Sequence, residues 1–504
     1  MGAGRENQWY REGEHAERYL LHTPAEIQVR NEAALDFVVA WHGDHIGHLL
    51  HAGFEWRWKP DNGFDLPLVQ QRVPGKLPPF ILSLLPEGWL ERVLKKRDDR
   101  AILRSGKRYM SNITISTRAS DLEALPADVL VTRLDDFRTG SIFTGTYAGP
   151  SRENIEQNFE EKLARLYASA DTPRLSGVQI KAPMFLGADG ELVPGTALPF
   201  THILKPAGTS GFQALPVIEF LAMTLGRHAG LDTASTALTA MPDQMPPALI
   251  VERFDIRATA DDQRRFALED LCSVLDLPPE LKYDGTIEPV APAVRPLSTE
   301  VEADLIVVLK RALFAWLIAD GDMHLKNLAL LKIAQPNARS FATVRLAPLY
   351  DAVTTVVFPG LEHDRMALKI NGKDNRLGRS DFLKMAATAG LTAKAANQAI
   401  EETLAGLRPG IDAVTIPEVA GINEDIAAKA EQMLAICRER LSNFECWRSF
   451  VGKQDRLSES VIGPERSATG TGFVSSFFFS TFSVGHCHSL HAISEALDTF
   501  AQFT

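Results

Sequence analysis

The stretch LIADGDMHLKNLALLK, residues 317–332, sets ionisable and amide side chains between two apolar flanks. Within it Asp322 precedes Asn327 by five residues, and Asp351 follows in LAPLYDA, 24 residues after the asparagine. Phosphoryl transfer needs one carboxylate to accept the proton of the attacking hydroxyl, and an amide oxygen with a second carboxylate to hold Mg²⁺ on the phosphates. The pattern therefore indicates phosphoryl transfer, whereas a lone Asp–Asn pair at this spacing is also common in solvated turns.

The same chemistry needs positive charge upstream, and the sequence supplies it in the order that protein kinases use. The segment RLSGVQIK, residues 174–181, contains a glycine turn that could cover phosphates. Lys205 stands in the predicted strand THILKP, and Glu219, fourteen residues later in a predicted helix, could hold that lysine. The strand IVERFD would link two lobes, where an adenine could meet backbone groups of Glu252 and Phe254. Each residue alone has an ordinary structural explanation, and their order is what favours kinase chemistry.

The surrounding sequence predicts the elements that would hold these residues. Residues 299–317 carry leucines at helical spacing and a possible capping box from Thr299 and Glu302, which predicts a long helix that ends at the Asp–Asn stretch. Strand and turn signals alternate over residues 172–258, and the chain then turns mostly helical. A β-rich lobe therefore precedes a helical lobe.

The domain organisation follows from these changes in texture. We predict a polar leader over 1–30, an N-terminal α+β subdomain over 31–150, a β-rich lobe over 151–258, a helical lobe over 259–450, and a linker with an atypical Phe-rich tail over 451–504.

Composition bounds the class of protein. The 504 residues are 45% hydrophobic and 23% charged, which is typical of a globular protein with more than one domain. A net charge of -11 argues against a chain whose main role is to wrap nucleic acid. The four cysteines form no CxxC pair, which favours a reducing compartment. Without an apolar leader or a run of eighteen apolar residues, we expect a cytoplasmic protein with no membrane span.

Longer segments carry a resemblance to a known family. They are AWHGDHIGHLL, LSLLPEG, LSGVQIK, THILKP, IEFLAMTLGRHAGL, ALIVERFD, LEDLCSVLDLPPELKY, FAWLIADGDMHLKNLAL, LAPLYDAV and ALKINGK, and they span roughly residues 37–445. With them the chain resembles the HipA family of serine/threonine kinases, the toxins of bacterial HipBA-type toxin–antitoxin modules. The resemblance implies an α+β fold, a two-lobed protein-kinase-like fold with a β-rich N-lobe and a helical C-lobe, and an extra N-terminal β-rich subdomain.

The resemblance also implies a role for each matched position. Asp322 would be the catalytic base, and Asn327 and Asp351 would hold Mg²⁺. The residues that would bind ATP are Ser176, Gly177, Val178, Gln179, Ile180, Lys181, Lys205, Glu252, Arg253, Phe254, His324, Asn327 and Asp351.

The family further implies a substrate and a partner. Its members phosphorylate a serine of protein substrates, among them aminoacyl-tRNA synthetases, and so arrest translation. A small HipB-like helix-turn-helix antitoxin usually binds the kinase, which would bring this chain to DNA only indirectly. In well-known members a regulatory serine lies where this chain has Arg174, so Ser176 is the candidate here for autophosphorylation.

Two other interpretations of the function stay open. The chain could be a catalytically silent co-repressor scaffold for a DNA-binding partner, or a kinase for a small molecule.

Two further segments carry weaker signals. The segment GHCHSLH, residues 485–491, groups metal-ligating side chains but fits no zinc module. The locally basic LKINGKDNRLGRSDFLK is best explained as a solvated face, with DNA phosphate as the alternative partner.

Overall fold

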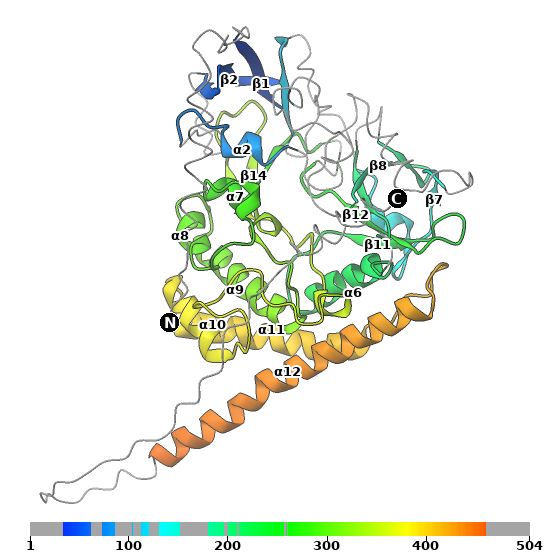
Figure 1. Cartoon of the computed structure of the whole chain (residues 1–504), viewed down its shortest axis with the longest axis vertical. Helices are drawn as coiled ribbons and strands as arrows, with labels where there is room; N and C mark the ends of the chain where they lie inside the picture. Colours follow the sequence, from blue (N-terminus) through cyan, green and yellow to red (C-terminus); the bar gives the residue numbers. More distant parts are fainter. Residues whose placement is uncertain are drawn as a thin grey trace, which may run out of the picture.

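The fold is known from a computed structural model (Figure 1), which describes only part of the chain. The described residues are 34–61, 73–85, 103, 112–119, 131–151, 180–195, 200–208, 211–256, 259 and 261–459, with side chains of the last range described to Phe444. The predicted leader over 1–30 lies outside these residues, and so do the predicted linker and tail after residue 459.

A four-stranded antiparallel sheet forms the N-terminal part, drawn in blue in Figure 1. Its strands, in the order β3-β2-β1-β4, are β1 (Leu35–Trp41), β2 (Asp44–Ala52), β3 (Glu55–Pro60) and β4 (Ile113–Ser116). Alternating apolar residues such as Phe37, Val39 and Trp41 turn one face into a core, which the short helix α2 (Pro79–Leu82) joins through Phe80 and Ile81.

The second sheet has eight strands in the order β5-β6-β11-β12-β10-β8-β9-β7. They are β5 (Arg138–Thr139), β6 (Ile142–Phe143), β7 (Thr146–Tyr147), β8 (Ala182–Leu186), β9 (Glu191–Pro194), β10 (His202–Lys205), β11 (Thr236–Thr239) and β12 (Ala248–Glu252). Strand β12 is buried on both faces, because Ala248 and Ile250 point to the core of the sheet while Leu249 and Val251 point to the core around helix α6 (Leu215–His228).

Helices and a smaller sheet make up the rest. The helices are α7 (Leu271–Val274), α8 (Val290–Val294), α9 (Val301–Leu317), α10 (Arg379–Thr388), α11 (Ala393–Ala413) and α12 (Glu424–Glu459), and the sheet is β13 (Arg265–Asp270), β14 (Ala329–Ala334) and β15 (Thr343–Leu346). Figure 1 shows α12 running along the lower edge and then beyond the other elements. The sheet supports the N-terminal part, since Trp41 donates its indole N–H to the Phe266 carbonyl oxygen at 3.1 Å.

The expected α+β fold, with a β-rich lobe and a helical lobe, is confirmed. The domain boundaries stay a prediction, and two details differ from expectation. Strands β5, β6 and β7 precede residue 151 yet pair into the eight-stranded sheet. Helix α12 continues through residues 451–459, which the sequence placed in the linker, because KQDRLSE contains residues that favour helix.

The expected capping box of α9 is wrong. The helix begins at Val301 with Glu300 at its N-cap, and no side chain makes a capping hydrogen bond there. Thr299 instead joins the neighbouring strand β15, because its backbone N–H and its hydroxyl both bond to the carbonyl oxygen of Val344. The strand thus competes successfully for the hydroxyl that would have capped the helix.

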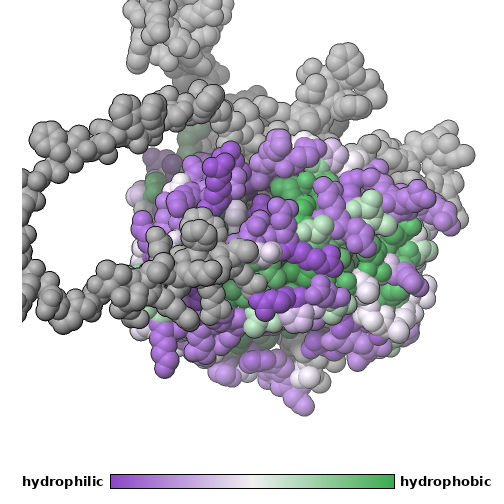
Figure 2. Space-filling view, turned by 90° about the horizontal axis from the view of Figure 1, so that it is seen from below, coloured by the Kyte–Doolittle hydropathy of each residue, from purple (hydrophilic) through white to green (hydrophobic). Residues whose placement is uncertain are grey.

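The described helices include none that is long and apolar enough to cross a membrane. Figure 2 shows the molecule from the side on which α12 lies, where hydrophilic residues interrupt the hydrophobic areas.

Candidate functional site

The end of α9 aims the Asp–Asn stretch. The N–H of Asp320 donates to the Ala315 carbonyl oxygen at 2.8 Å, and the N–H of Ala319 donates to the Trp316 carbonyl oxygen at 3.3 Å. These two bonds form a Schellman motif, which requires a left-handed residue after the helix. Ala319 takes this role at φ 57°, a conformation that costs a non-glycine residue about 1–2 kcal/mol. The chain therefore turns sharply just before the candidate catalytic carboxylate.

Hydrogen bonds then fix the loop internally. The N–H of Asp322 donates to Asp320 Oδ1 at 2.9 Å, and Asn327 Nδ2 donates to the Asp322 carbonyl oxygen at 2.8 Å. At Gly321 an added Cβ would lie 2.0 Å from Asp364 Oδ2, so a larger residue does not fit there. Because its NH₂ group is turned to the backbone, Asn327 presents its amide oxygen on the other side of the group.

The Asp322 carboxylate is partly buried, with 27% of its side chain exposed. Tyr283 donates its hydroxyl to Asp322 Oδ1 at 2.6 Å. Burial is the main cause that raises the pKa of Asp322 to about 6, and the negative charge of Asp351 adds to it. The hydrogen bond from Tyr283 acts in the opposite direction and lowers this pKa. Such a carboxylate is a stronger base than an exposed aspartate and is still ionised at neutral pH.

His324 lies beside this carboxylate as a neutral ring. Its Nε2 is 4.0 Å from Asp322 Oδ1, and its ring meets the edge of Tyr283 with centroids 4.8 Å apart. Burial, followed by the nearby Lys282, holds the pKa of His324 well below its usual range. Its Nδ1 is buried and has no hydrogen-bond partner among the described residues.

A cluster of opposite charges joins the two lobes. Lys205, at the end of β10, forms a buried ion pair with Glu219 of α6. Its Nζ also lies 3.2 Å from Asp351 Oδ1, and Lys181 Nζ lies 3.4 Å from the other oxygen of Asp351. The four residues thus form one set, which we call the charge cluster.

Burial and pairing act against each other within the charge cluster. Burial alone would lower the pKa of Lys205, but Asp351 and Glu219 outweigh it and raise that pKa. Burial would raise the pKa of Asp351, but Lys205 and Lys181 outweigh it and hold that pKa well below its usual range. Asp351 is therefore ionised, whereas burial raises the pKa of Glu219 against the opposing effect of Lys205.

The donor set suits a hard cation. Asn327 offers an amide oxygen, and Asp351 offers an ionised carboxylate, and Mg²⁺ prefers oxygen ligands of these kinds. The residues present therefore fit the expected Mg²⁺.

The strand expected to meet adenine is engaged in the fold through two of its side chains. The Glu252 carboxylate accepts the Leu134 N–H at 2.7 Å and contacts Arg133 at 2.8 Å, and Arg253 forms a two-pronged pair with Asp255. The Phe254 ring lies 5.8 Å from the Tyr350 ring, next in the chain to Asp351. The Phe254 side chain thus contacts a residue adjoining the charge cluster, and adenine contacts stay a prediction.

The structure thus brings two groups of predicted residues together, the charge cluster and the loop from Asp322 to Asn327, which act on each other electrostatically. Ile180 and Lys181 are described, whereas Ser176, Gly177, Val178 and Gln179 lie outside the described residues. The segment 485–491 also lies outside them.

Sequence reasoning missed some contributors. Tyr283 closes LEDLCSVLDLPPELKY, but nothing in that segment says that its hydroxyl reaches Asp322. Asp320 had a visible signal, because it stands two residues before Asp322 in DGD. Arg311, buried in α9, donates to the Asn327 carbonyl oxygen at 2.7 Å and had no signal beyond being a charge in an apolar helix.

Comparison with known proteins gives three kinds of match. A family model described as HipA-like C-terminal domain matches residues 174–410. The curated protein named "Putative kinase Y4mE", from Sinorhizobium fredii (strain NBRC 101917 / NGR234), is 34% identical over 213 residues, which are 41% of this chain and 48% of that protein. From the same strain, "Putative kinase Y4dM" is 26% identical over 348 residues, which are 66% of this chain and 76% of that protein. The chain thus spans about half the length of the first relative that it matches.

The fold is similar to that of a solved chain from the Shewanella oneidensis MR-1 toxin–antitoxin system, a complex of HipA, HipB and its operator DNA. The TM-score is 0.58 at 17% identity, over 81% of this chain and 97% of that one. At this identity the likeness shows the fold.

Proposed function

We propose that the chain is an ATP-dependent serine/threonine protein kinase, and the match of residues 174–410 to a family model described as HipA-like C-terminal domain supports this proposal. The observation that carries the proposal is the contact of Lys205 with both Glu219 and Asp351, beside a loop that offers Asp322 as a base. Phosphoryl transfer uses these residue types in this arrangement. The two curated relatives bear kinase names, which supports the same class of reaction.

Each residue has a defined task in this reaction. Asp322 accepts the proton of the serine hydroxyl as its oxygen attacks the γ-phosphorus and the bond to the β-phosphate breaks. Lys205 and Lys181 turn from Asp351 to the phosphate oxygens and orient them. Asn327 and Asp351 would hold Mg²⁺, which would supply positive charge against the phosphates. Tyr283 positions Asp322 through its hydrogen bond.

The substrate and partner are part of the proposal. We propose a protein substrate with a reactive serine, an aminoacyl-tRNA synthetase being the candidate that the family resemblance suggests, together with Ser176 of the chain itself. The solved structural neighbour belongs to a complex with HipB and operator DNA. By that analogy, a small DNA-binding antitoxin is the partner we propose.

Incubation of the purified full chain with ATP and Mg²⁺ tests the proposal. Intact-mass analysis should show added phosphate, and phosphosite mapping should place it at Ser176, with the variant Ser176→Ala as the control for that position. ATP with Mg²⁺ should also raise the melting temperature, because a ligand that binds only the folded chain stabilises it. If the chain gains no phosphate and is not stabilised by ATP with Mg²⁺, the silent co-repressor scaffold becomes the better explanation.

The rate of phosphate transfer should depend on pH through Asp322. Because its pKa is raised to about 6, the rate should rise as pH increases through that value and should be lost below it. The variant Tyr283→Phe removes a hydrogen bond that lowers this pKa, so the midpoint should move up by about one pH unit. Rate measurements between about pH 5 and 8 would check this range.

Tyr350→Phe is the matched control. It removes a hydroxyl that bonds to the Lys326 carbonyl oxygen at 2.6 Å and leaves the Asp322 hydrogen bond in place. Its midpoint should equal that of the wild type. Equal shifts in both variants would show that Tyr283 does not set the pKa of Asp322.

A further inference from the structure

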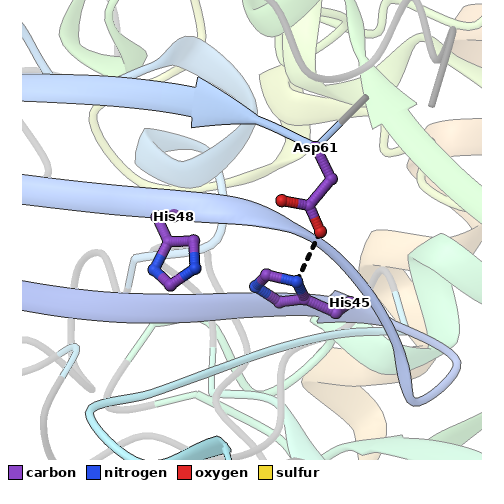
Figure 3. A group of neighbouring side chains, drawn as sticks. All are labelled: His45, His48 and Asp61. Carbon is purple, nitrogen blue, oxygen red and sulfur yellow. Dashed lines mark ion pairs between the residues drawn. The ribbon is translucent and has the colours of Figure 1, made fainter. Parts of the chain in front are cut away.

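The N-terminal sheet carries a cluster of ligating side chains that the kinase reaction does not use. His45, His48 and Asp61 each offer one ligand atom, and these atoms all lie within 4.8 Å of one another. Figure 3 shows the two imidazole rings side by side and nearly perpendicular, with the Asp61 carboxylate on the side of the His45 ring that faces away from His48. We propose that this cluster binds a divalent transition-metal ion, with Zn²⁺ as the ion that fits its donors best.

A β-bulge brings the two histidines to one face. Residues three apart on a regular strand point to opposite faces. In this hairpin Ala40 pairs with His45 while the preceding Val39 pairs with Gly47, so Ile46 is an extra residue in β2. The bulge therefore turns His45 and His48 to the same side, opposite the face on which Ile46 and Leu49 are buried.

The neighbouring strand brings Asp61 to the same place. At Gly47 an added Cβ would lie 2.5 Å from the Lys59 carbonyl oxygen and 2.9 Å from Pro60 Cα, so glycine is what allows β3 to pass this close. The N–H of Asp61 then bonds to the Ile46 carbonyl oxygen at 2.9 Å, directly at the bulge. The carboxylate is thereby fixed beside His45, with which it forms an ion pair.

The hydrogen bonds of the two rings leave their Nε2 atoms facing the gap between them. Asp36 contacts Nδ1 of His48 at 2.8 Å, and Asp61 contacts Nδ1 of His45. Metal-bound histidines usually have such a carboxylate on the second nitrogen, where it fixes the ring and its tautomer. His45 Nε2 is buried and has no hydrogen-bond partner in the described part of the chain. Buried polar atoms nearly always have such a partner, so this nitrogen is an exception.

The distances fit a small ion. Two nitrogen ligands at about 2.0 Å from a tetrahedral Zn²⁺ lie about 3.3 Å apart, and the present ligand atoms lie within 4.8 Å of one another, so the rings have to close by at most about 1.5 Å. Two imidazole nitrogens, each ring held by a carboxylate on its other nitrogen, are borderline ligands that suit Zn²⁺ better than Mg²⁺ or Ca²⁺. The side chains are about a third exposed, at 36%, 35% and 37% for His45, His48 and Asp61, so water can complete the coordination.

The proposal is tested with Zn²⁺ on the full-length chain by isothermal titration. The parent for all variants is a chain in which the separate metal-ligating stretch, residues 485–491, has its histidines and cysteine replaced, so that it does not add binding of its own. The parent should bind one more Zn²⁺ per chain than the variant His45→Gln/His48→Gln. With Co²⁺ as the probe, the parent alone should show the visible absorption of a low-coordinate site.

Two single variants sharpen the test. Asp36→Asn leaves both histidines and Asp61 in place and should weaken Zn²⁺ binding by about 10–100-fold. His363→Gln, which removes an exposed histidine elsewhere on the surface, should bind like the parent. Melting curves without metal show that each variant folds. Equal stoichiometry and affinity in the parent and in His45→Gln/His48→Gln would overturn the proposal.

Discussion

Phosphate transfer by the variant Asp322→Asn should be slower than that of the wild type by about 10²–10⁴-fold, the usual contribution of a positioned general base. The amide keeps the shape of the carboxylate and can still accept the Tyr283 hydrogen bond, so the loop should keep its structure. What is lost is the capacity to take up the proton of the attacking hydroxyl. Single-turnover rates of phosphate incorporation, followed by intact mass, measure the effect.

ATP binding separates this outcome from misfolding. In the proposed reaction Asp322 contacts the attacking hydroxyl and not the nucleotide, so the melting-temperature rise produced by ATP and Mg²⁺ should persist in the variant. Asp284→Asn, which replaces an exposed aspartate close by in the chain, should retain the wild-type rate. A wild-type rate in Asp322→Asn would remove this residue from the role of base.

The variant Lys205→Met should lose about 3–5 kcal/mol of folding stability, the range for breaking a buried ion pair from one side. Glu219 is 1% exposed and would keep its carboxyl group in the interior without the lysine. Asp351 would still have Lys181, so most of the loss falls on Glu219. Urea unfolding of both proteins, followed by circular dichroism, measures the difference.

The pH dependence identifies the cause of this loss. Burial already raises the pKa of Glu219, and without Lys205, which lowers it, that pKa rises further. The folded variant then holds a proton that the unfolded chain releases, so its free energy of unfolding should fall as pH rises from about 5 to 8. Lys205→Met/Glu219→Gln should lack this fall and recover part of the stability. The same slope in both variants would place the cause elsewhere.

The sequence predicted those parts of the site that are local in the chain. Asp322 and Asn327 share one short loop, whose turn is set by the end of α9, so their spacing already implies proximity. Lys205 and Glu219 lie at the end of β10 and in the helix α6 that covers the sheet, and the periodicity of the two segments indicated both elements. The α+β fold was predictable for the same reason, since each lobe has its own hydrophobic pattern.

Contacts between distant segments were not predictable in this way. The hydroxyl of Tyr283 reaches Asp322 across 39 residues, and the pairing of β13 with β14 joins Arg265 to Ala334. Such contacts depend on how whole elements pack, and hydrophobic periodicity carries no information on partners. The bulge at Ile46 is a further case, because the single extra residue is visible only when the register with β1 is known.

If the chain binds ATP as proposed, the charge cluster makes nucleotide binding an exchange of counter-ions. Both oxygens of Asp351 already face ammonium groups, at 3.2 Å and 3.4 Å. Lys205 and Lys181 can turn to the phosphates only by giving up the Asp351 carboxylate. This carboxylate and the phosphate would then be two anions side by side, unless a cation takes the place of the lysines at Asp351. In the proposed reaction, metal-free ATP should therefore gain little from the lysines, whereas ATP that arrives with Mg²⁺ should keep every charge partnered. The chain would thus tie its affinity for the nucleotide to that for the metal, through a carboxylate that serves each in turn.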